Sequence, residues 1–385
     1  MKSLNIMIKP ASSLCNMRCK YCFYDEVSDI REVKSYGIMT EKAMRDVLSV
    51  IEKDLENGDR INFAFQGGEP TLAGIDFFKK FVSIVEGWCV NVNVSYALQT
   101  NGTLIDENWC VFLKNNNFLV GVSFDILSEN HDELRVDTEG KGTYKRVLHS
   151  IQLLEKYKVE YNVLCTLTNS IARYPQKVWN KIVQLKLKYV QFTPCLGNLK
   201  NDANAAFSLT PKRFAQFYTK LFKLWYEAYK REKYISIKLF DDIINLMVLK
   251  IPTSCGINGF CKVQLVVEAD GSVYPCDFYC LDEYRLGNIR EQSFVELLKS
   301  QNVHKFLTRP HKQPQTCDKC RYKHFCAGNC KRMQREICCD ENSSYCGYRD
   351  FLDKCSNDFI IISNEIIMRN CNKIPKVSLW RKFTI

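Results

Sequence analysis

Three cysteines near the N-terminus have a spacing that could hold an iron-sulfur cluster. Cys15, Cys19 and Cys22 lie in the sequence CNMRCKYC, which follows a short apolar run. Three thiolates can bind three irons of a 4Fe-4S cubane and leave the fourth iron open to a small molecule, whereas electron-transfer clusters usually have four cysteines. The spacing therefore predicts a cluster that takes part in chemistry rather than one that only carries electrons.

A second chemical signal follows the next apolar run. The segment Ile61–Phe65 leads into Gln66, Gly67, Gly68 and Glu69. Glycines directly after a strand let a ligand approach the backbone closely, and Glu69 could accept a hydrogen bond from an amine. A Gly-Gly pair is also a common turn, so this segment alone does not decide between a binding loop and a plain turn.

Eight further cysteines form a regular array in the last third of the chain. Paired cysteines of this kind also bind structural zinc, and the ligand type alone does not separate zinc from iron-sulfur clusters. Cys338 and Cys339 lie inside the array and could replace its last member as a ligand. The array consists of Cys255, Cys261, Cys276, Cys317, Cys320, Cys326, Cys330 and Cys346.

The elements that must position these residues follow a strand-helix repeat. Six short apolar runs alternate with segments of helical period such as 41–55 and 144–157, which predicts a parallel α/β sheet curled into a partial (β/α)6 barrel. Loops after parallel strands share one rim, where chemistry is normally sited. The six predicted strands are 4–9, 61–65, 93–99, 119–124, 161–168 and 189–193.

The expected elements become shorter and the cysteines denser after about residue 250. A long amphipathic helix that opens at Thr210 precedes short strands, turns and dense cysteines, including a predicted hairpin over 265–274 with its turn at Asp270-Gly271. We therefore predict a barrel over 1–235, a small cysteine-rich α+β domain over 236–350 and a C-terminal helical segment over 351–385.

Composition limits the classes of partner. The 20 cysteines and the net charge of +11 are both unusual, but the basic residues are spread over apparent helices and form no dense stripe interleaved with aromatics. We therefore expect no nucleic-acid partner. No apolar run is long enough for a signal peptide or a membrane span, which predicts a cytoplasmic protein with no membrane contact, where clustered thiols bind metal rather than pair.

The order of the motifs resembles the radical S-adenosylmethionine (SAM) superfamily. CxxxCxxC followed by Phe-Tyr, and then GGEP after the second strand, are the features that carry this resemblance. It implies that Cys15, Cys19 and Cys22 hold a 4Fe-4S cluster whose open iron is chelated by SAM. The implied cofactor contacts are Tyr24 at the adenine, the loop Gln66, Gly67, Gly68 and Glu69, then Ser123 and Asp125 after the fourth strand, and Arg135 and Leu196.

The later array resembles the SPASM domain, which follows the barrel in radical SAM enzymes that modify peptides and proteins. Its pattern here is C-x9-G-x4-C, then C-x2-C-x5-C-x3-C, then a last cysteine. The resemblance implies two auxiliary 4Fe-4S clusters, and thus three clusters in all. Each auxiliary cluster would have four ligands: Cys255, Cys261, Cys276 and Cys330 for one, and Cys317, Cys320, Cys326 and Cys346 for the other.

Nearly the whole chain resembles the anaerobic sulfatase-maturating enzymes, through segments such as MIKPASS before Cys15 and VYPCDFY around Cys276. These enzymes oxidise a Cys or Ser of a nascent, unfolded sulfatase, within C/S-x-P/A-x-R, to Cα-formylglycine. The resemblance implies that a 5′-deoxyadenosyl radical removes a Cβ hydrogen, that Asp277 takes the thiol or hydroxyl proton, and that an auxiliary cluster takes the remaining electron. A serine then gives the aldehyde directly, and a cysteine gives a thioaldehyde that water converts to formylglycine. The resemblance further implies a monomer that receives its starting electron from a donor such as flavodoxin or ferredoxin.

Some alternatives stay open at this level. Asp277 could instead cap backbone amides at the end of the hairpin. The usual Asp-Gly-Pro of the resembling enzymes is replaced here by Asp125-Ile126-Leu127, which predicts another path for this loop. The chain could also be a maturase that forms a thioether or carbon-carbon crosslink in a ribosomal peptide. From another class, it could be a zinc-ribbon nucleic-acid-binding protein.

Overall fold

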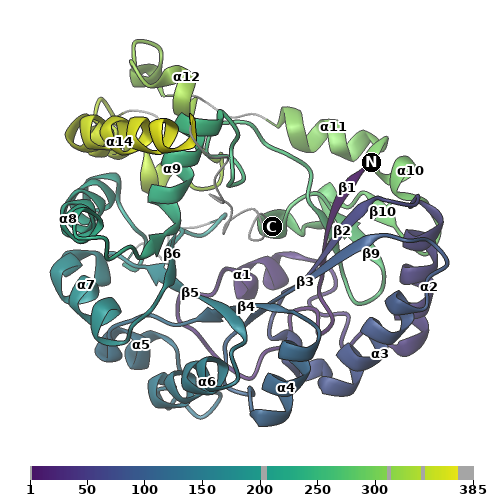
Figure 1. Cartoon of the computed structure of the whole chain (residues 1–385). Helices are drawn as coiled ribbons and strands as arrows, with labels where there is room; N and C mark the ends of the chain where they lie inside the picture. The colour runs from purple at the N-terminus through teal and green to yellow at the C-terminus, as the bar shows by residue number, and fades with distance from the viewer. Residues whose placement is uncertain (1, 201–205, 310–313, 340–342, 372–385) are drawn as a thin grey trace. The chain divides into compact units, whose positions relative to one another are not determined.

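The computed structural model describes residues 2–200, 206–309, 314–339 and 343–371. The chain forms two compact units, which are coloured by residue number in Figure 1. The first unit consists of Met1–Phe124, Asp132–Tyr161 and Lys262–Arg309. The second unit consists of Asp125–His131, Asn162–Cys261 and Pro310–Ile385. The predicted domain boundaries at 235 and 350 stay predictions.

The first unit is built on parallel strands that run in sequence order across the sheet. These strands are β1 (Ser3–Ile8), β2 (Arg60–Phe65), β3 (Asn93–Thr100) and β4 (Leu119–Ser123). Fully buried aromatic side chains of β2 pack on α3, with Phe63 and Phe65 in edge contact with Phe81 at 5.0 and 4.9 Å. The helices between the strands are α1 (Phe23–Ile30), α2 (Glu41–Lys53), α3 (Ile75–Glu86), α4 (Glu107–Asn115) and α6 (Tyr144–Lys156), with the short η1 (Pro70–Ala73).

The predicted hairpin extends this same sheet. Strand β8 (Leu265–Val267) pairs parallel with β1, and β9 (Ser272–Tyr274) returns antiparallel to β8. Gly271 at the turn has φ +88, and a Cβ there would lie 2.7 Å from Oδ1 of Asn288, so the position requires glycine. The other elements of this part are β10 (Gly287–Asn288), η3 (Asp277–Tyr279), η4 (Asp282–Tyr284), α10 (Phe294–Leu298) and α11 (Gln301–Thr308).

The second unit combines three parallel strands with an aromatic helical core. The predicted long helix is confirmed as α8 (Pro211–Lys230), and Thr210 caps it by accepting from the amide of Arg213. Phe222 of α8 contacts Phe359 at 4.3 Å between ring centroids. The remaining elements are β5 (Glu160–Leu167), β6 (Tyr189–Pro194), β7 (Ser236–Ile237), η2 (Ile171–Arg173), α7 (Pro175–Gln184), α9 (Lys238–Leu249), η5 (Gln315–Cys317), α12 (Lys323–Cys326), α13 (Gln334–Ile337) and α14 (Gly347–Cys371); α5 (Ser128–Leu134) crosses from one unit to the other.

The sequence-based elements agree closely with the structure. Each of the six predicted strands is confirmed to within one residue at either end, and the C-terminal helix is confirmed as α14. The loops after β1, β2 and β3 leave the same edge of the first unit's sheet because these strands are parallel. This edge therefore gathers the first cysteine motif, the Gly-Gly loop and the end of β3. Within the described residues, no helix has the length and apolar character needed to cross a lipid bilayer.

Candidate active site and cysteine clusters

The first cysteine motif lies between β1 and α1, and the end of β3 holds it in place. Asn101 donates from Nδ2 to Sγ of Cys15 at 3.8 Å and to Oδ1 of Asn16 at 2.9 Å. The backbone amide of Met17 also donates to Sγ of Cys15, at 3.4 Å. N–H groups directed at a sulfur favour its thiolate form, which is the form that ligates iron. The loop is therefore arranged to present Cys15 as a ligand.

Burial acts in the opposite direction on the same thiols. It raises the pKa of Cys15 to about 11 and also raises the pKa of Cys22. Binding a cluster must therefore release protons from these cysteines. Arg135 supplies a nearby positive charge, because its Nη1 lies 4.0 Å from Sγ of Cys19 and its guanidinium lies over the ring of Tyr21. Arg135, predicted as a cofactor contact, is thus located at the cysteine loop.

The Gly-Gly loop after β2 packs on the backbone that leads into Cys15. A Cβ on Gly68 would lie 2.1 Å from the carbonyl oxygen of Leu14, and one on Gly67 would lie 2.7 Å from that of Ser12. The amides of Gly68 and Glu69 donate to these carbonyls of Ser12 and Leu14 at 2.9 and 2.8 Å. The sequence suggested that glycine makes room for a ligand, whereas the structure shows that the chain's own backbone makes the close approach.

Gly68→Ala should displace the Cys15 loop, because the new Cβ would lie 2.1 Å from the carbonyl oxygen of Leu14. A flexible side chain could move aside, but this backbone atom cannot move without moving the loop. We expect the variant to lose about four of about twelve irons per chain after anaerobic reconstitution. Gly87→Ala is the matched control, because a Cβ on Gly87 would meet nothing closer than 3.4 Å. Iron and sulfide counting checks the prediction, and equal iron contents in the two variants would contradict it.

Glu69 is fully buried and ties the loop after β2 to the end of β3. Its carboxylate accepts from the amide and hydroxyl of Thr71 at 3.1 and 2.5 Å, from the hydroxyl of Thr100 at 2.7 Å and from the amide of Asn101 at 2.6 Å. Burial raises the pKa of Glu69 and these hydrogen bonds lower it, with a net shift upward. The carboxylate thus holds the loop after β2 against the end of β3. Its contact with a cofactor amine stays a prediction.

Asp277 lies at the start of η3 in a buried polar cluster of the first unit. Its Oδ2 accepts from the hydroxyl of Tyr24 at 2.5 Å and from Nε2 of Gln66 at 2.9 Å, and Gln66 also donates to the Tyr24 oxygen at 2.7 Å. Burial, with the nearby Asp277 charge, raises the pKa of Tyr24, so this hydroxyl keeps its proton and donates it. The structure thus brings together three residues that the sequence singled out separately.

Sequence reasoning missed the cations of this cluster. Nζ of Lys9 lies 3.1 Å from Oδ1 of Asp277 and 3.8 Å from Oε1 of Glu268, while Nη1 of Arg31 lies 2.6 Å from the same Glu268 oxygen. The four side chains are at most 8% exposed. One signal could have found them: Glu268 interrupts the apolar hairpin, and a buried carboxylate needs a cation.

The other predicted cofactor contacts lie at or after strand ends. Ser123 ends β4 and accepts from Nε2 of Gln99 at 3.0 Å. Asp125 accepts on Oδ1 from the backbone amide of Thr166 at 2.9 Å. Leu196 follows β6 and is buried. Their contacts with SAM stay predictions.

Ile126 replaces the glycine that the resembling enzymes usually carry. It is completely buried and has φ +25, in the left-handed region that β-branched residues rarely adopt. The backbone thus keeps a conformation suited to glycine although the residue is isoleucine. The predicted change in the path of this loop stays a prediction.

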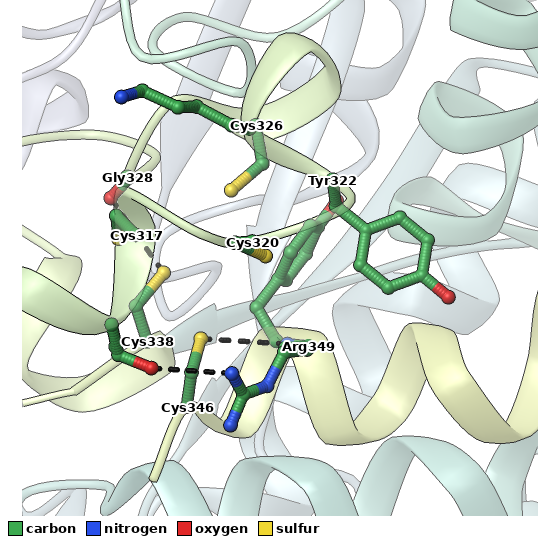
Figure 2. A pocket seen from close by; sticks show the side chains of 11 residues that line it. Cys317, Cys320, Tyr322, Cys326, Gly328, Cys338, Cys346 and Arg349 are labelled. Carbon is green, nitrogen blue, oxygen red and sulfur yellow. Dashed lines mark hydrogen bonds between the residues drawn. The ribbon is translucent and has the colours of Figure 1, made fainter. Parts of the chain in front are cut away.

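Five cysteines line one pocket of the second unit, and four of them belong to the later array. Figure 2 shows the sulfurs of Cys326, Cys338 and Cys346 directed into a common space, which Cys317 and Cys320 also line. The pocket contains all four predicted ligands of one auxiliary cluster together with the alternative ligand Cys338. A pocket lined by thiols fits an iron-sulfur cluster.

Hydrogen bonds distinguish Cys338 from Cys346. Sγ of Cys346 accepts from the amide of Arg349 at 3.5 Å, whereas Sγ of Cys338 donates to the carbonyl of Gly328 at 3.6 Å. Because Cys346 is the acceptor, we expect Cys346→Ala to lose about four irons and Cys338→Ala to keep them. Iron counting on the two purified variants checks this, and the reverse pattern would make Cys338 the ligand.

Cys326 and Cys330 are four positions apart in the chain but contact different parts of the second unit. Residues 327–329 between them all have positive φ, at 40, 88 and 64. Cys326 lines the pocket, whereas Cys330 packs on Gly256, where a Cβ would lie 2.7 Å from Cβ of Cys330. Because Gly256 is next to Cys255 in the chain, this separation supports the two predicted ligand sets.

Three cysteines of the other predicted ligand set lie in the second unit. Burial raises the pKa of Cys330, and nearby Cys255 and Cys261 add to this, so these three cysteines are neighbours in the second unit. Cys276 precedes η3 and belongs to the first unit. In the described parts of the chain, no disulfide joins two of the cysteines from Cys15 to Cys355. Among these same residues, no three His, Cys, Asp or Glu side chains are grouped so as to hold a single metal ion.

Comparisons with known proteins agree with this site. The radical SAM superfamily model matches residues 10–171, and the SPASM iron-sulfur cluster-binding domain model matches residues 260–321. A cysteine-type anaerobic sulfatase-maturating enzyme of Clostridium novyi is 41% identical over 334 residues, which cover 86% of this chain and 89% of the relative. The chain belongs to the family of anaerobic sulfatase-maturating enzymes. The alternative of a zinc-ribbon nucleic-acid-binding protein was therefore wrong.

A second relative and a solved structure agree with this assignment. A serine-type anaerobic sulfatase-maturating enzyme of Bacteroides thetaiotaomicron is 29% identical over 86% of this chain and 83% of the relative. The solved structure of native anSMEcpe with bound AdoMet and the Cp18Cys peptide matches with a TM-score of 0.85 and 39% identity, over 94% of this chain and 99% of that chain. The radical SAM and SPASM architecture predicted from the sequence is therefore confirmed.

Proposed function

We propose that this chain oxidises a cysteine of a sulfatase polypeptide to Cα-formylglycine under anaerobic conditions. The observation that carries the proposal is the buried Asp277, which Tyr24 and Gln66 hold beside the loop predicted to bind SAM. The preference for cysteine over serine is supported by 41% identity to a cysteine-type enzyme against 29% to a serine-type enzyme.

Three 4Fe-4S clusters and SAM are the proposed cofactors. Cys15, Cys19 and Cys22 would hold the first cluster, which together with SAM supplies a 5′-deoxyadenosyl radical when both are bound. Asn101 and Arg135 orient these cysteines through the contacts already described. The auxiliary ligand sets are Cys255, Cys261, Cys276 and Cys330, and Cys317, Cys320, Cys326 and Cys346.

Asp277 is the proposed acceptor of the substrate's thiol proton. Its Oδ2 already accepts two hydrogen bonds, from Tyr24 and Gln66. Its Oδ1 contacts Nζ of Lys9 at 3.1 Å, and a carboxylate oxygen can accept a further hydrogen bond beside such a contact. Tyr24 and Gln66 therefore fix the carboxylate, and Oδ1 takes the proton.

The proposed substrate is an unfolded or nascent segment with the motif C-x-P/A-x-R. The solved anSMEcpe structure contains a bound peptide, which supports a peptide segment as the species recognised. A flavodoxin or ferredoxin is the proposed electron donor, and the proposed active form is a monomer. The identity of the sulfatase does not enter the proposal.

An anaerobic peptide assay tests the function. The reconstituted protein is incubated with SAM, a reductant and three matched peptides that carry Cys, Ser or Ala at the target position. We expect an aldehyde on the Cys peptide, a slower reaction on the Ser peptide and none on the Ala peptide. A thioether or carbon-carbon crosslink in the Cys peptide, or no change in mass, would overturn the proposal.

A further inference from the structure

Lys9 is a buried lysine that the proposed mechanism has not yet used. It follows β1, and its backbone amide donates to the carbonyl of Val267 in β8 at 2.8 Å. Its side chain is 3% exposed, and its Cγ lies 3.2 Å from where a Cβ on Gly67 would stand. The absence of a side chain on Gly67 thus leaves the space that the Lys9 stem fills, next to the loop predicted to bind SAM.

The ammonium group at the end of this stem faces Asp277. It lies 3.1 Å from Oδ1 of Asp277, donates to Sγ of Cys280 at 3.3 Å and stands 4.8 Å from the centre of the Tyr24 ring. Burial raises the pKa of Cys280 to about 12, so this partner is a neutral thiol. Burial alone would lower the pKa of Lys9, but its neighbours outweigh burial and raise it. Lys9 is therefore a fixed positive charge.

The buried cluster contains two carboxylates and two cations, and Lys9 is one of the cations. Asp277 and Glu268 are the two carboxylates, and Lys9 and Arg31 are the two cations. Arg31 pairs with Glu268 at 2.6 Å, and Lys9 is the cation that contacts Asp277. Removing Lys9 would leave Asp277 without the cation that contacts it, and a buried charge without its partner is costly. Removing Arg31 would instead take the nearest cation from Glu268 and leave Lys9 at Asp277. We therefore expect the Asp277 carboxylate to rotate away from its present orientation when Lys9 is removed.

We propose that Lys9 is a positioning residue that fixes the orientation of the Asp277 carboxylate, so that Oδ2 faces Tyr24 and Gln66 while Oδ1 is held on the opposite side. This inference rests on the proposed function, in which Asp277 accepts the substrate proton. Lys9 acts through Asp277 and makes no contact with the reacting atoms in this account. Lys9 directly follows β1 and its amide is bonded to β8, which suits this role because precise sites are held by regular elements.

The test compares three variants for the amount of formylglycine formed per SAM cleaved. Lys9→Met removes the charge and keeps most of the length of the side chain, and Lys9→Arg keeps the charge. Arg31→Met is the matched control, since it removes the other buried cation of the same cluster without touching Asp277. Iron content and the KM for SAM are measured on each protein, and crystal structures of Lys9→Met and wild type report the orientation of Asp277.

We expect Lys9→Met to lower formylglycine per SAM cleaved by roughly 100-fold, as misplaced catalytic groups do. Iron content and the KM for SAM should stay within twofold of wild type, Lys9→Arg should recover part of the loss, and Arg31→Met should keep the wild-type ratio. Equal losses in Lys9→Met and Arg31→Met, or no loss in Lys9→Met, would overturn the inference.

The test also separates this inference from the proposed function. If the wild-type protein forms no formylglycine, the proposed function fails, and the inference is judged by the crystal structures alone. An Asp277 side chain that keeps its orientation in Lys9→Met would then overturn the positioning role. If Lys9→Met does not fold, Lys9→Arg decides. A smaller product ratio together with a turned Asp277 side chain supports the positioning role, and a smaller ratio with Asp277 in its wild-type orientation contradicts it.

Discussion

Asp277→Asn is expected to keep SAM cleavage while formylglycine formation falls by about 10²–10⁴-fold, the usual contribution of a general base. Asparagine has the same shape and can still accept from Tyr24 and Gln66, which now donate to Oδ2 of Asp277. An amide cannot, however, take up the substrate proton. Quantifying 5′-deoxyadenosine and formylglycine in the same reaction separates the two steps.

A nearby carboxylate provides the control for this substitution. Asp282 starts η4, five positions further along the chain, and its exposed side chain accepts from the amide of Glu32 at 2.9 Å. Asp282→Asn should therefore keep both cleavage and product. Product formation by Asp277→Asn at the wild-type rate would mean that another group takes the proton.

Replacing Cys15, Cys19 and Cys22 together by alanine is expected to abolish SAM cleavage. The reason is that these thiols, which Asn101 and Arg135 orient, are the proposed ligands of the first cluster. The variant should lose about four of about twelve irons and keep the rest, because the auxiliary ligand sets are separate. Anaerobic iron counting and the yield of 5′-deoxyadenosine measure both effects.

Cys89 serves as the control for the loss of a thiol as such. It is exposed and lies outside both cysteine arrays. Cys89→Ala should therefore match wild type in iron content and in SAM cleavage. Residual cleavage in the triple variant well above the level without enzyme would contradict the assignment of the first cluster to these cysteines.

Local patterns in the sequence predicted the strands and the cysteine motifs because both depend on neighbouring residues. Strand periodicity placed β1 to within one residue, and the turn chemistry of Asp270-Gly271 placed the hairpin. The pairing of β8 with β1 was not predicted, since it joins segments more than 250 residues apart. Register between such distant segments is set by packing, which no local pattern records.

Sequence reasoning also missed residues whose partners lie far away in the chain. Lys9 and Asp277 look unrelated in the chain, and only the contact between β1 and β8 brings them to 3.1 Å. The backbone of residues 12–14 approaches Gly67 and Gly68, a close contact between segments that no local pattern records. The hydroxyl of Tyr24 has a partner in Asp277, and the predicted contacts of these three residues with SAM stay predictions.

In the proposed reaction, a Cβ hydrogen is removed from a target cysteine and that residue becomes formylglycine. The decisive assay uses a peptide with the motif C-x-P-x-R in which both Cβ hydrogens of the target cysteine are deuterium, incubated anaerobically with the reconstituted protein and SAM. We expect one deuterium in 5′-deoxyadenosine and one retained in the aldehyde. An aldehyde that retains no deuterium, unlabelled 5′-deoxyadenosine, or a crosslinked peptide without aldehyde would contradict the proposed reaction.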